Sequence, residues 1–198
     1  MILNHIILAI LWIIYCLLHS VLASITVKNK LKQILGTTYK HYRLFYTLFS
    51  FFFLVAVLYY QVTITTTLLF NFYPPVFISG IIIGSAGLFL MMICIKKYFM
   101  NLSGLKSLVN EGSYSQLEIK GVHRYVRHPL YLGTFAFIWG LLLVFPYLSL
   151  LIANAIITMY TLVGIKLEEK KLVDEFGEQY SQYCKQVPKL LPGFKPKQ

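Results

Sequence analysis

Three long stretches of this chain carry no charged side chain. Residues 1–27, 44–95 and 128–165 contain no Asp, Glu, Lys or Arg. A helix needs about 20 apolar residues to cross a bilayer, so the first stretch predicts one spanning helix and the second predicts two. The third stretch fits two short spans joined by a tight turn at residues 145–147. The sequence therefore predicts an all-α integral membrane protein with five transmembrane helices.

The charged residues predict which way these helices cross the membrane. All 18 basic residues lie in three segments, 28–43, 96–127 and 166–198, and the seven acids lie within the same segments. Short loops rich in Lys and Arg stay on the cytosolic side, so the N-terminus is expected outside and the C-terminus inside. Residues 1–27 lack the basic start of a signal peptide and are interpreted as a retained helix.

The net charge of +11 fits basic loops that face anionic lipid headgroups. We therefore expect anionic lipids as partners and do not expect nucleic acid binding. The Lys- and Ile-rich composition indicates a bacterial cytoplasmic membrane, with the endoplasmic reticulum as the alternative for a eukaryotic chain.

The first predicted helix has one polar face. His5, Trp12, Cys16 and His19 are spaced seven, four and three residues apart, so they share a face that should point toward other helices. Each histidine could bond a neighbouring helix, or the two could ligate a haem. The spacing of the three cysteines fits neither a redox motif nor a metal site, so no disulfide and no metal is predicted. These cysteines are Cys16, Cys94 and Cys184.

Two predicted helices carry seams of small residues. Gly80, Gly84 and Gly87 lie on one face of the third helix. The fourth helix, which begins at Pro129, carries a similar seam on one face and aromatic rings on another. Small seams let another helix backbone approach closely in a membrane, so both are interpreted as packing surfaces. The second seam is Gly133, Ala136 and Gly140, and the rings are Tyr131, Phe135 and Trp139.

The start of the fourth helix gathers basic groups. The sequence GVHRYVRHPLYLG occupies residues 121–133, and Pro129 suits the first turn of a helix because its missing N–H would have no intrahelical partner. His128 then lies near the cap, where helix N-termini favour anions. Arg124 and Arg127 add positive charge, and arginine suits bidentate contact with a carboxylate. The sequence predicts an anion-binding corner at the inner membrane interface.

The fifth predicted helix ends near Gly164, and the residues after it predict an amphipathic cytosolic helix. Glu169 lies within its apolar stripe and Glu168 lies at the edge. A carboxylate on a buried face is costly unless a cation meets it, and that cation could be a neighbouring Lys or Arg or could belong to a ligand. The stripe consists of Ile165, Leu172, Phe176, Tyr180 and Tyr183.

These features predict one cytosolic pocket with an anion site, a buried carboxylate and aromatic walls. A compact zwitterion that bears an extra cation and an aromatic base would suit such a pocket. S-adenosylmethionine has this chemistry.

The chain resembles the membrane methyltransferase family that includes isoprenylcysteine carboxyl methyltransferase and the phospholipid N-methyltransferases. The family pattern Gly-x-x-Arg-Tyr-x-Arg-His-Pro-x-Tyr falls on residues 121–131. The pattern Glu-Glu-x-x-Leu-x-x-x-Phe-Gly-x-x-Tyr-x-x-Tyr falls on residues 168–183, and a Val-Pro follows at 187–188. In the amino-terminal half, HSVLAS and YRLFY resemble bacterial branches that include methanethiol S-methyltransferases.

The resemblance implies a single methyltransferase domain, with a three-helix part at 1–95 and a cofactor-binding part at 96–198. It implies that S-adenosylmethionine binds at the cytosolic face and that the acceptor enters laterally from the bilayer. The cofactor-binding residues implied by the two motifs are Gly121, Arg124, Tyr125, Arg127, His128, Pro129, Tyr131, Glu168 and Glu169.

Methyl transfer from a sulfonium is an in-line displacement in which the enzyme mainly aligns the reactants. His128, Glu169 and His123 are candidate bases, and Phe135, Trp139 and His19 are candidate acceptor-pocket residues. The leading hypothesis is a small lipophilic thiol or carboxylate acceptor, and a phospholipid amine is the alternative. A non-enzymatic haem-binding, quinone-binding or transport protein is the alternative from another class.

Overall fold

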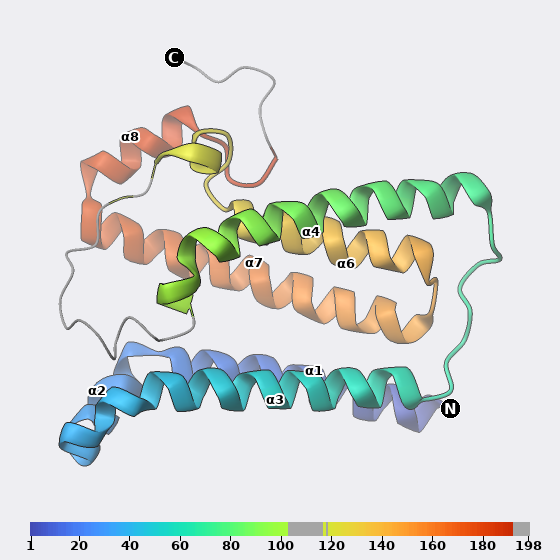
Figure 1. The fold of residues 1–198 in the computed structure, drawn as a ribbon, viewed down its shortest axis with the longest axis horizontal. Coiled ribbons are helices and arrows are strands. Elements are labelled where there is room, and N and C mark those ends of the chain that lie inside the picture. Colours follow the sequence, from blue (N-terminus) through green and yellow to red (C-terminus); the bar gives the residue numbers. More distant parts are fainter. Residues whose placement is uncertain (103–116, 118, 192–198) are drawn as a thin grey trace. The chain divides into compact units, whose positions relative to one another are not determined.

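The computed structural model describes residues 1–102, 117 and 119–191, and these residues are mainly helical (Figure 1). They form two compact units. The first unit comprises residues 1–71, 98–102 and 146–157, and the second comprises 72–97 with the described parts of 114–145 and 158–191. The predicted division into a three-helix part at 1–95 and a cofactor-binding part at 96–198 remains a prediction. It concerns where the cofactor binds, whereas the two compact units are defined by packing.

The first unit is built around helices α1 (Ile2–Ala23) and α3 (Tyr42–Thr63), which lie side by side (Figure 1). Trp12 on α1 is buried and donates a hydrogen bond of 2.8 Å from Nε1 to Oε1 of Gln61 on α3. His5 and Cys16 are buried on the same side of α1. The predicted inward face of the first helix is therefore confirmed.

A short basic helix connects α1 to α3. Ser24 caps helix α2 (Ile25–Leu35) by accepting a hydrogen bond of 3.3 Å from the Val27 N–H at its hydroxyl. The 3₁₀ helix η1 (Gly36–His41) then leads directly into α3. At the other end of α3, Leu68 forms an antiparallel bridge with Tyr147 and so ties two connecting segments together.

In the second unit, helices α4 (Pro74–Leu102) and α6 (Pro129–Val144) meet through their glycines. A Cβ added at Gly87 would lie 2.5 Å from the Phe137 nitrogen, and one added at Gly140 would lie 2.5 Å from the Gly84 nitrogen. Both distances are shorter than real Cβ contacts, so the two backbones touch where a side chain would stand. The two predicted seams are confirmed, and they face each other.

The helix that follows α6 is longer than the sequence predicted. Helix α7 (Leu148–Phe176) continues through Gly164 without a break, and the amphipathic helix α8 (Glu178–Gln186) starts only after Gly177. The prediction that this helix ends near Gly164 is wrong, because one helical glycine costs about 1 kcal/mol and the following Leu, Glu and Lys residues favour the helix. Gly177 has φ +51°, a conformation that favours glycine, and ends it.

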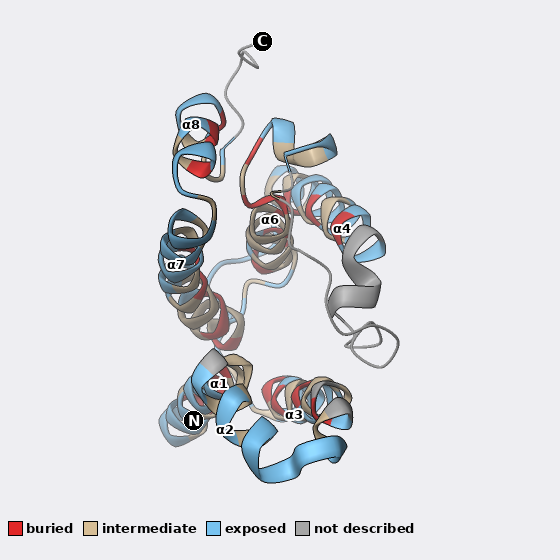
Figure 2. Ribbon diagram, turned by 90° about the vertical axis from the view of Figure 1, so that its left-hand side faces the viewer, coloured by how far each residue is buried: buried red, intermediate tan, exposed pale blue. Residues whose placement is uncertain are grey.

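Four described helices are long and apolar enough to cross a membrane: α1, α3, α4 and α7. Helix α6 is apolar but has only 16 residues, and at 1.5 Å per residue it is shorter than the roughly 30 Å core of a bilayer. Large apolar side chains such as Ile2, Phe52 and Phe89 are exposed, and the colours of the ribbon in Figure 2 mark exposed residues on α1 and α3. The protein is an all-helical, multi-pass membrane protein; the predicted span at α6 and the orientation remain predictions.

Candidate functional site

The site begins at the backbone corner before α6. The 3₁₀ helix η2 (Gly121–Arg124) opens with Gly121 at φ +65°, which favours glycine, and Pro129 occupies the first turn of α6 as predicted. The N–H groups of Arg127 and His128 donate to the carbonyl oxygens of residues 188 and 189, at 2.9 and 3.2 Å. The C-terminal segment is thereby held against the corner by main-chain bonds.

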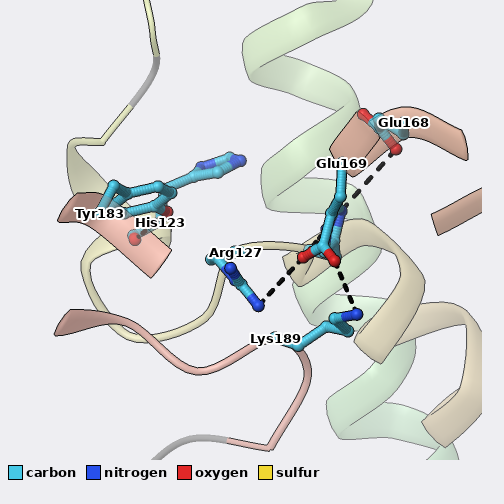
Figure 3. A network of polar contacts seen from close by, with 7 residues as sticks. His123, Arg127, Glu168, Glu169, Tyr183 and Lys189 are labelled. Carbon is cyan, nitrogen blue, oxygen red and sulfur yellow. Dashed lines mark hydrogen bonds and ion pairs between the residues drawn. The ribbon is translucent and has the colours of Figure 1, made fainter. Parts of the chain in front are cut away.

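Glu169 on α7 is the centre of a cluster of charged groups (Figure 3). Its Oε1 lies 3.0 Å from Nη2 of Arg127 and 3.3 Å from Nε2 of His128. Its Oε2 lies 2.6 Å from Nζ of Lys189. The structure therefore brings the predicted basic corner and the predicted acidic pair together, and an intraprotein cation meets the Glu169 carboxylate.

These groups are largely shielded from solvent. The side chains of Arg127, His128 and Glu169 are 11%, 4% and 16% exposed. Removing one partner of a buried ion pair leaves an uncompensated charge, which costs about 3–5 kcal/mol. The side chain of Glu168 is 45% exposed, and its Oε2 lies 3.7 Å from the other ring nitrogen of His128. His128 thus stands between two carboxylates, and these contacts fix its ring.

Aromatic groups border the cluster. The ring of Tyr131 stacks on His128 with centroids 5.7 Å apart, and its phenol interacts with Glu168. Further along α6, Trp139 donates from Nε1 to the Thr158 hydroxyl at 3.2 Å, and Phe135 is half-buried. Tyr131 belongs to the cluster, whereas the acceptor-pocket role of Phe135 and Trp139 remains a prediction.

Helix α8 contributes two buried tyrosines. Tyr183 donates from its hydroxyl to the His123 carbonyl at 2.6 Å (Figure 3). Tyr180 is buried, and burial together with the nearby Glu169 carboxylate raises the pKa of its phenol above the ordinary value, so the hydroxyl stays protonated at neutral pH. The two rings pack with Val187, Leu172 and Phe176, so four of the five predicted stripe residues share one cluster, although the predicted single amphipathic helix is broken at Gly177.

Other predicted site residues lie outside the ion cluster. Arg124 and Tyr125 are exposed, and Gly121 serves the turn. His19 lies in the first unit, where its Nδ1 is 3.0 Å from the Tyr46 hydroxyl, as expected for a histidine that bonds a neighbouring helix. Their cofactor or acceptor roles remain predictions.

Lys189 is the member of the cluster that sequence reasoning missed. The available signal was the carboxylate of Glu169 inside an apolar stripe, which demands a cation. The Val-Pro step at 187–188 turns the chain back, and the next residue is a lysine. Periodicity within one helix does not identify a partner that arrives after such a turn.

A comparison with known families matches residues 78–179 to the phospholipid methyltransferase family, which is just over half of the chain. Because this match covers more than half of the chain, the chain belongs to that family. The match contains α6 and the Glu168–Glu169 pair, and Lys189 falls beyond it. No solved structure matches significantly.

Curated relatives add to this result. A methanethiol S-methyltransferase of Crocosphaera subtropica is 42% identical over 86 residues, which are 41% of this chain and 32% of that protein. Methanethiol S-methyltransferase 1 of Bradyrhizobium diazoefficiens is 40% identical over 36% of this chain and 24% of its own length. A protein-S-isoprenylcysteine O-methyltransferase of Schizosaccharomyces pombe is 39% identical over 36% of this chain and 31% of its own length. The matches thus span about a third or less of these relatives.

Proposed function

We propose that the protein is an S-adenosylmethionine-dependent membrane methyltransferase that acts on a small lipophilic thiol or carboxylate acceptor. The observation that carries the proposal is the cluster in which Glu169 meets Arg127, His128 and Lys189 at the start of α6. Membership of the phospholipid methyltransferase family supports it, as do the relatives named for methanethiol and isoprenylcysteine methylation.

The chemistry of the cluster fits the donor. S-adenosylmethionine carries a carboxylate, an ammonium and a sulfonium beside an aromatic base. Arg127 offers the guanidinium for the carboxylate, and its buried Nε has no hydrogen-bond partner among the described residues. Glu169 and Glu168 offer negative charge for the cationic groups, and the stacked His128 and Tyr131 rings offer an aromatic surface.

When bound, S-adenosylmethionine would supply an electrophilic methyl group. The residues of this chain would then orient the reactants, which is the main contribution to an in-line displacement. Arg127 and Glu169 position the donor, and His128, fixed between two carboxylates, shapes the site. A thiolate or carboxylate acceptor needs little help from a base, whereas an amine must lose a proton. His128, Glu169 and His123 are the candidate bases for that case.

The second candidate is methylation of a phospholipid amine headgroup, which the name of the matching family favours. In both cases we propose that the acceptor enters from the bilayer and that the site faces the cytosol, because the basic segments flank it.

Donor binding is the first test. Purified protein in detergent should bind S-adenosylmethionine in isothermal titration calorimetry, and both Glu169→Gln and Arg127→Ala should weaken binding at least about tenfold, as expected for lost charge-assisted bonds. The matched controls Asp174→Asn and Lys171→Ala change exposed charges on the same helix and should bind like wild type. Undiminished affinity in both site variants removes the assignment.

The acceptor is identified by mass spectrometry of lipid and thiol extracts from cells with and without the protein. A product heavier by one methylene in the thiol fraction supports the leading proposal, and one in the phospholipid amine fraction supports the alternative. A Soret band in the purified protein, with no label transferred from S-adenosylmethionine, would point to a haem protein instead.

A further inference from the structure

The two oxygens of Glu169 are in different environments. Oε1 contacts Arg127 and His128, which belong to the corner and whose side chains are 11% and 4% exposed. Oε2 contacts only one cation in the described part of the chain, Lys189, whose side chain is 42% exposed. The pair on Oε1 is therefore a fixed part of the fold, and the pair on Oε2 lies toward solvent.

The ion pair on Oε2 is the easier one to exchange. Ion pairs that water reaches contribute little stability, because solvation compensates both charges when they separate. Lysine is also a strongly hydrated point charge on a flexible stem, whereas the arginine fork fixes its geometry. Lys189 can therefore leave Oε2 without leaving a buried charge unpaired, because Arg127 still neutralises Glu169.

The backbone beside Lys189 does not need to move with the side chain. The carbonyl oxygens of Pro188 and Lys189 accept from the Arg127 and His128 N–H groups, and Val187 is buried against the α8 tyrosines. We call residues 187–189 the C-terminal strap. The strap thus holds the Lys189 side chain within reach of Glu169 whether or not the ion pair is formed.

We propose that Lys189 is a resident cation that occupies the Glu169 Oε2 position and yields it to a cationic group of the ligand. The inference rests on the proposed function, since it names the ammonium or sulfonium of the donor as that group. The Arg127 Nε, which has no hydrogen-bond partner among the residues that the structure describes, belongs to the same cluster and can donate to the ligand carboxylate. Lys189 is therefore a positioning residue, because only a ligand with a cationic group can replace its ammonium at Glu169.

Competition by a resident cation has a measurable consequence. When a ligand must first displace a side chain, its apparent Kd equals the intrinsic Kd divided by the fraction of time that the site is open. Since an ion pair that water reaches is weak, Lys189→Met should lower the Kd for S-adenosylmethionine only about two- to fivefold. Lys189→Arg keeps the cation and should not tighten binding. Lys185→Met, which changes an exposed lysine on α8, is the matched control and should leave the Kd unchanged.

The state of the Lys189 ammonium is measured directly by labelling with an amine-reactive ester, followed by peptide mapping. In Glu169→Gln the labelling of Lys189 should rise at least about twofold relative to Lys185, because the ion pair is lost. In wild-type protein, saturating S-adenosylmethionine should raise it likewise. The labelling of Glu169→Gln can be measured without any ligand. The labelling of wild-type protein with S-adenosylmethionine does not depend on a variant that folds.

The outcomes separate the two proposals. If Glu169→Gln exposes Lys189 but wild type binds no S-adenosylmethionine, the resident ion pair stands, while the proposed donor and the exchange on it are both wrong. If S-adenosylmethionine binds but Lys189 labelling stays constant, or if Lys189→Met weakens binding, Lys189 is not displaced and the inference is overturned while the proposed function stands.

Discussion

The two compact units hold their helices together in opposite ways. In the first unit, α1 and α3 are joined by large side chains and by neutral hydrogen bonds, such as that between Trp12 and Gln61. In the second unit, α4 and α6 touch backbone to backbone at their glycines, and a cluster of buried charges lies at the start of α6. Neutral pairs specify packing at low cost, whereas buried charges are expensive and are kept where they have a chemical use.

Loss of a buried charge in the second unit should have the largest effect. Arg127→Met leaves Glu169 without the more buried of its arginine and lysine partners and should lower the free energy of unfolding by about 3 kcal/mol. The exposed Lys171→Met is the control and should change it by less than about 0.5 kcal/mol. Unfolding in mixed detergent micelles, followed by circular dichroism, measures both variants. If Arg127→Met and Lys171→Met are equally stable, the charge cluster does not contribute to the stability of the second unit.

Glycine packing in the second unit should come next. Gly140→Ala places a Cβ 2.5 Å from the Gly84 nitrogen, so the helices must separate, and overpacking of this kind costs about 1–3 kcal/mol. Gly84→Ala meets its nearest neighbour only at 3.8 Å and should be tolerated. Each variant adds one methyl group, on facing helices. The same unfolding assay compares them, and a Gly84→Ala variant as unstable as Gly140→Ala would contradict the packing described.

The neutral pair of the first unit should be replaceable. Trp12→Phe leaves the buried Gln61 amide without its donor and should cost about 1–3 kcal/mol. The double variant Trp12→Phe with Gln61→Leu removes both polar groups and should recover part of that loss. A double-mutant cycle on unfolding free energies measures the coupling. Additive losses would mean that the hydrogen bond does not hold the helices together.

The smallest effect should come from Tyr180, which packs beside the cluster without carrying a charge at neutral pH. Tyr180→Phe should change stability by about 1 kcal/mol or less at pH 7. The folded-state pKa of Tyr180 is raised above the unfolded value of 10.0, so its contribution is complete below pH 10.0 and is lost as the pH rises further. The stability difference between wild type and Tyr180→Phe should therefore shrink between pH 10 and pH 11 in thermal unfolding. A difference independent of pH would contradict the shift.

Several features of the fold and the site could be predicted because they are local. The start of α6 follows from Pro129, the inward face of α1 follows from helical spacing, and the glycine seams follow from residue size. The end of the fifth helix was predicted wrongly at Gly164, because a glycine in a helix is a modest cost that neighbouring residues can offset. The actual break at Gly177 depends on a backbone conformation rather than on composition.

The sequence by itself determined that this is a membrane protein, because the length of its uncharged stretches is a property of the chain alone. It also singled out Arg127, His128 and the Glu168–Glu169 pair, because burying a charge is costly in any fold. Only the tertiary structure decided which cations meet Glu169 and that Lys189 is among them. An ion pair forms between groups that folding brings within a few ångströms, and here the turns at Gly177 and after α8 bring them together.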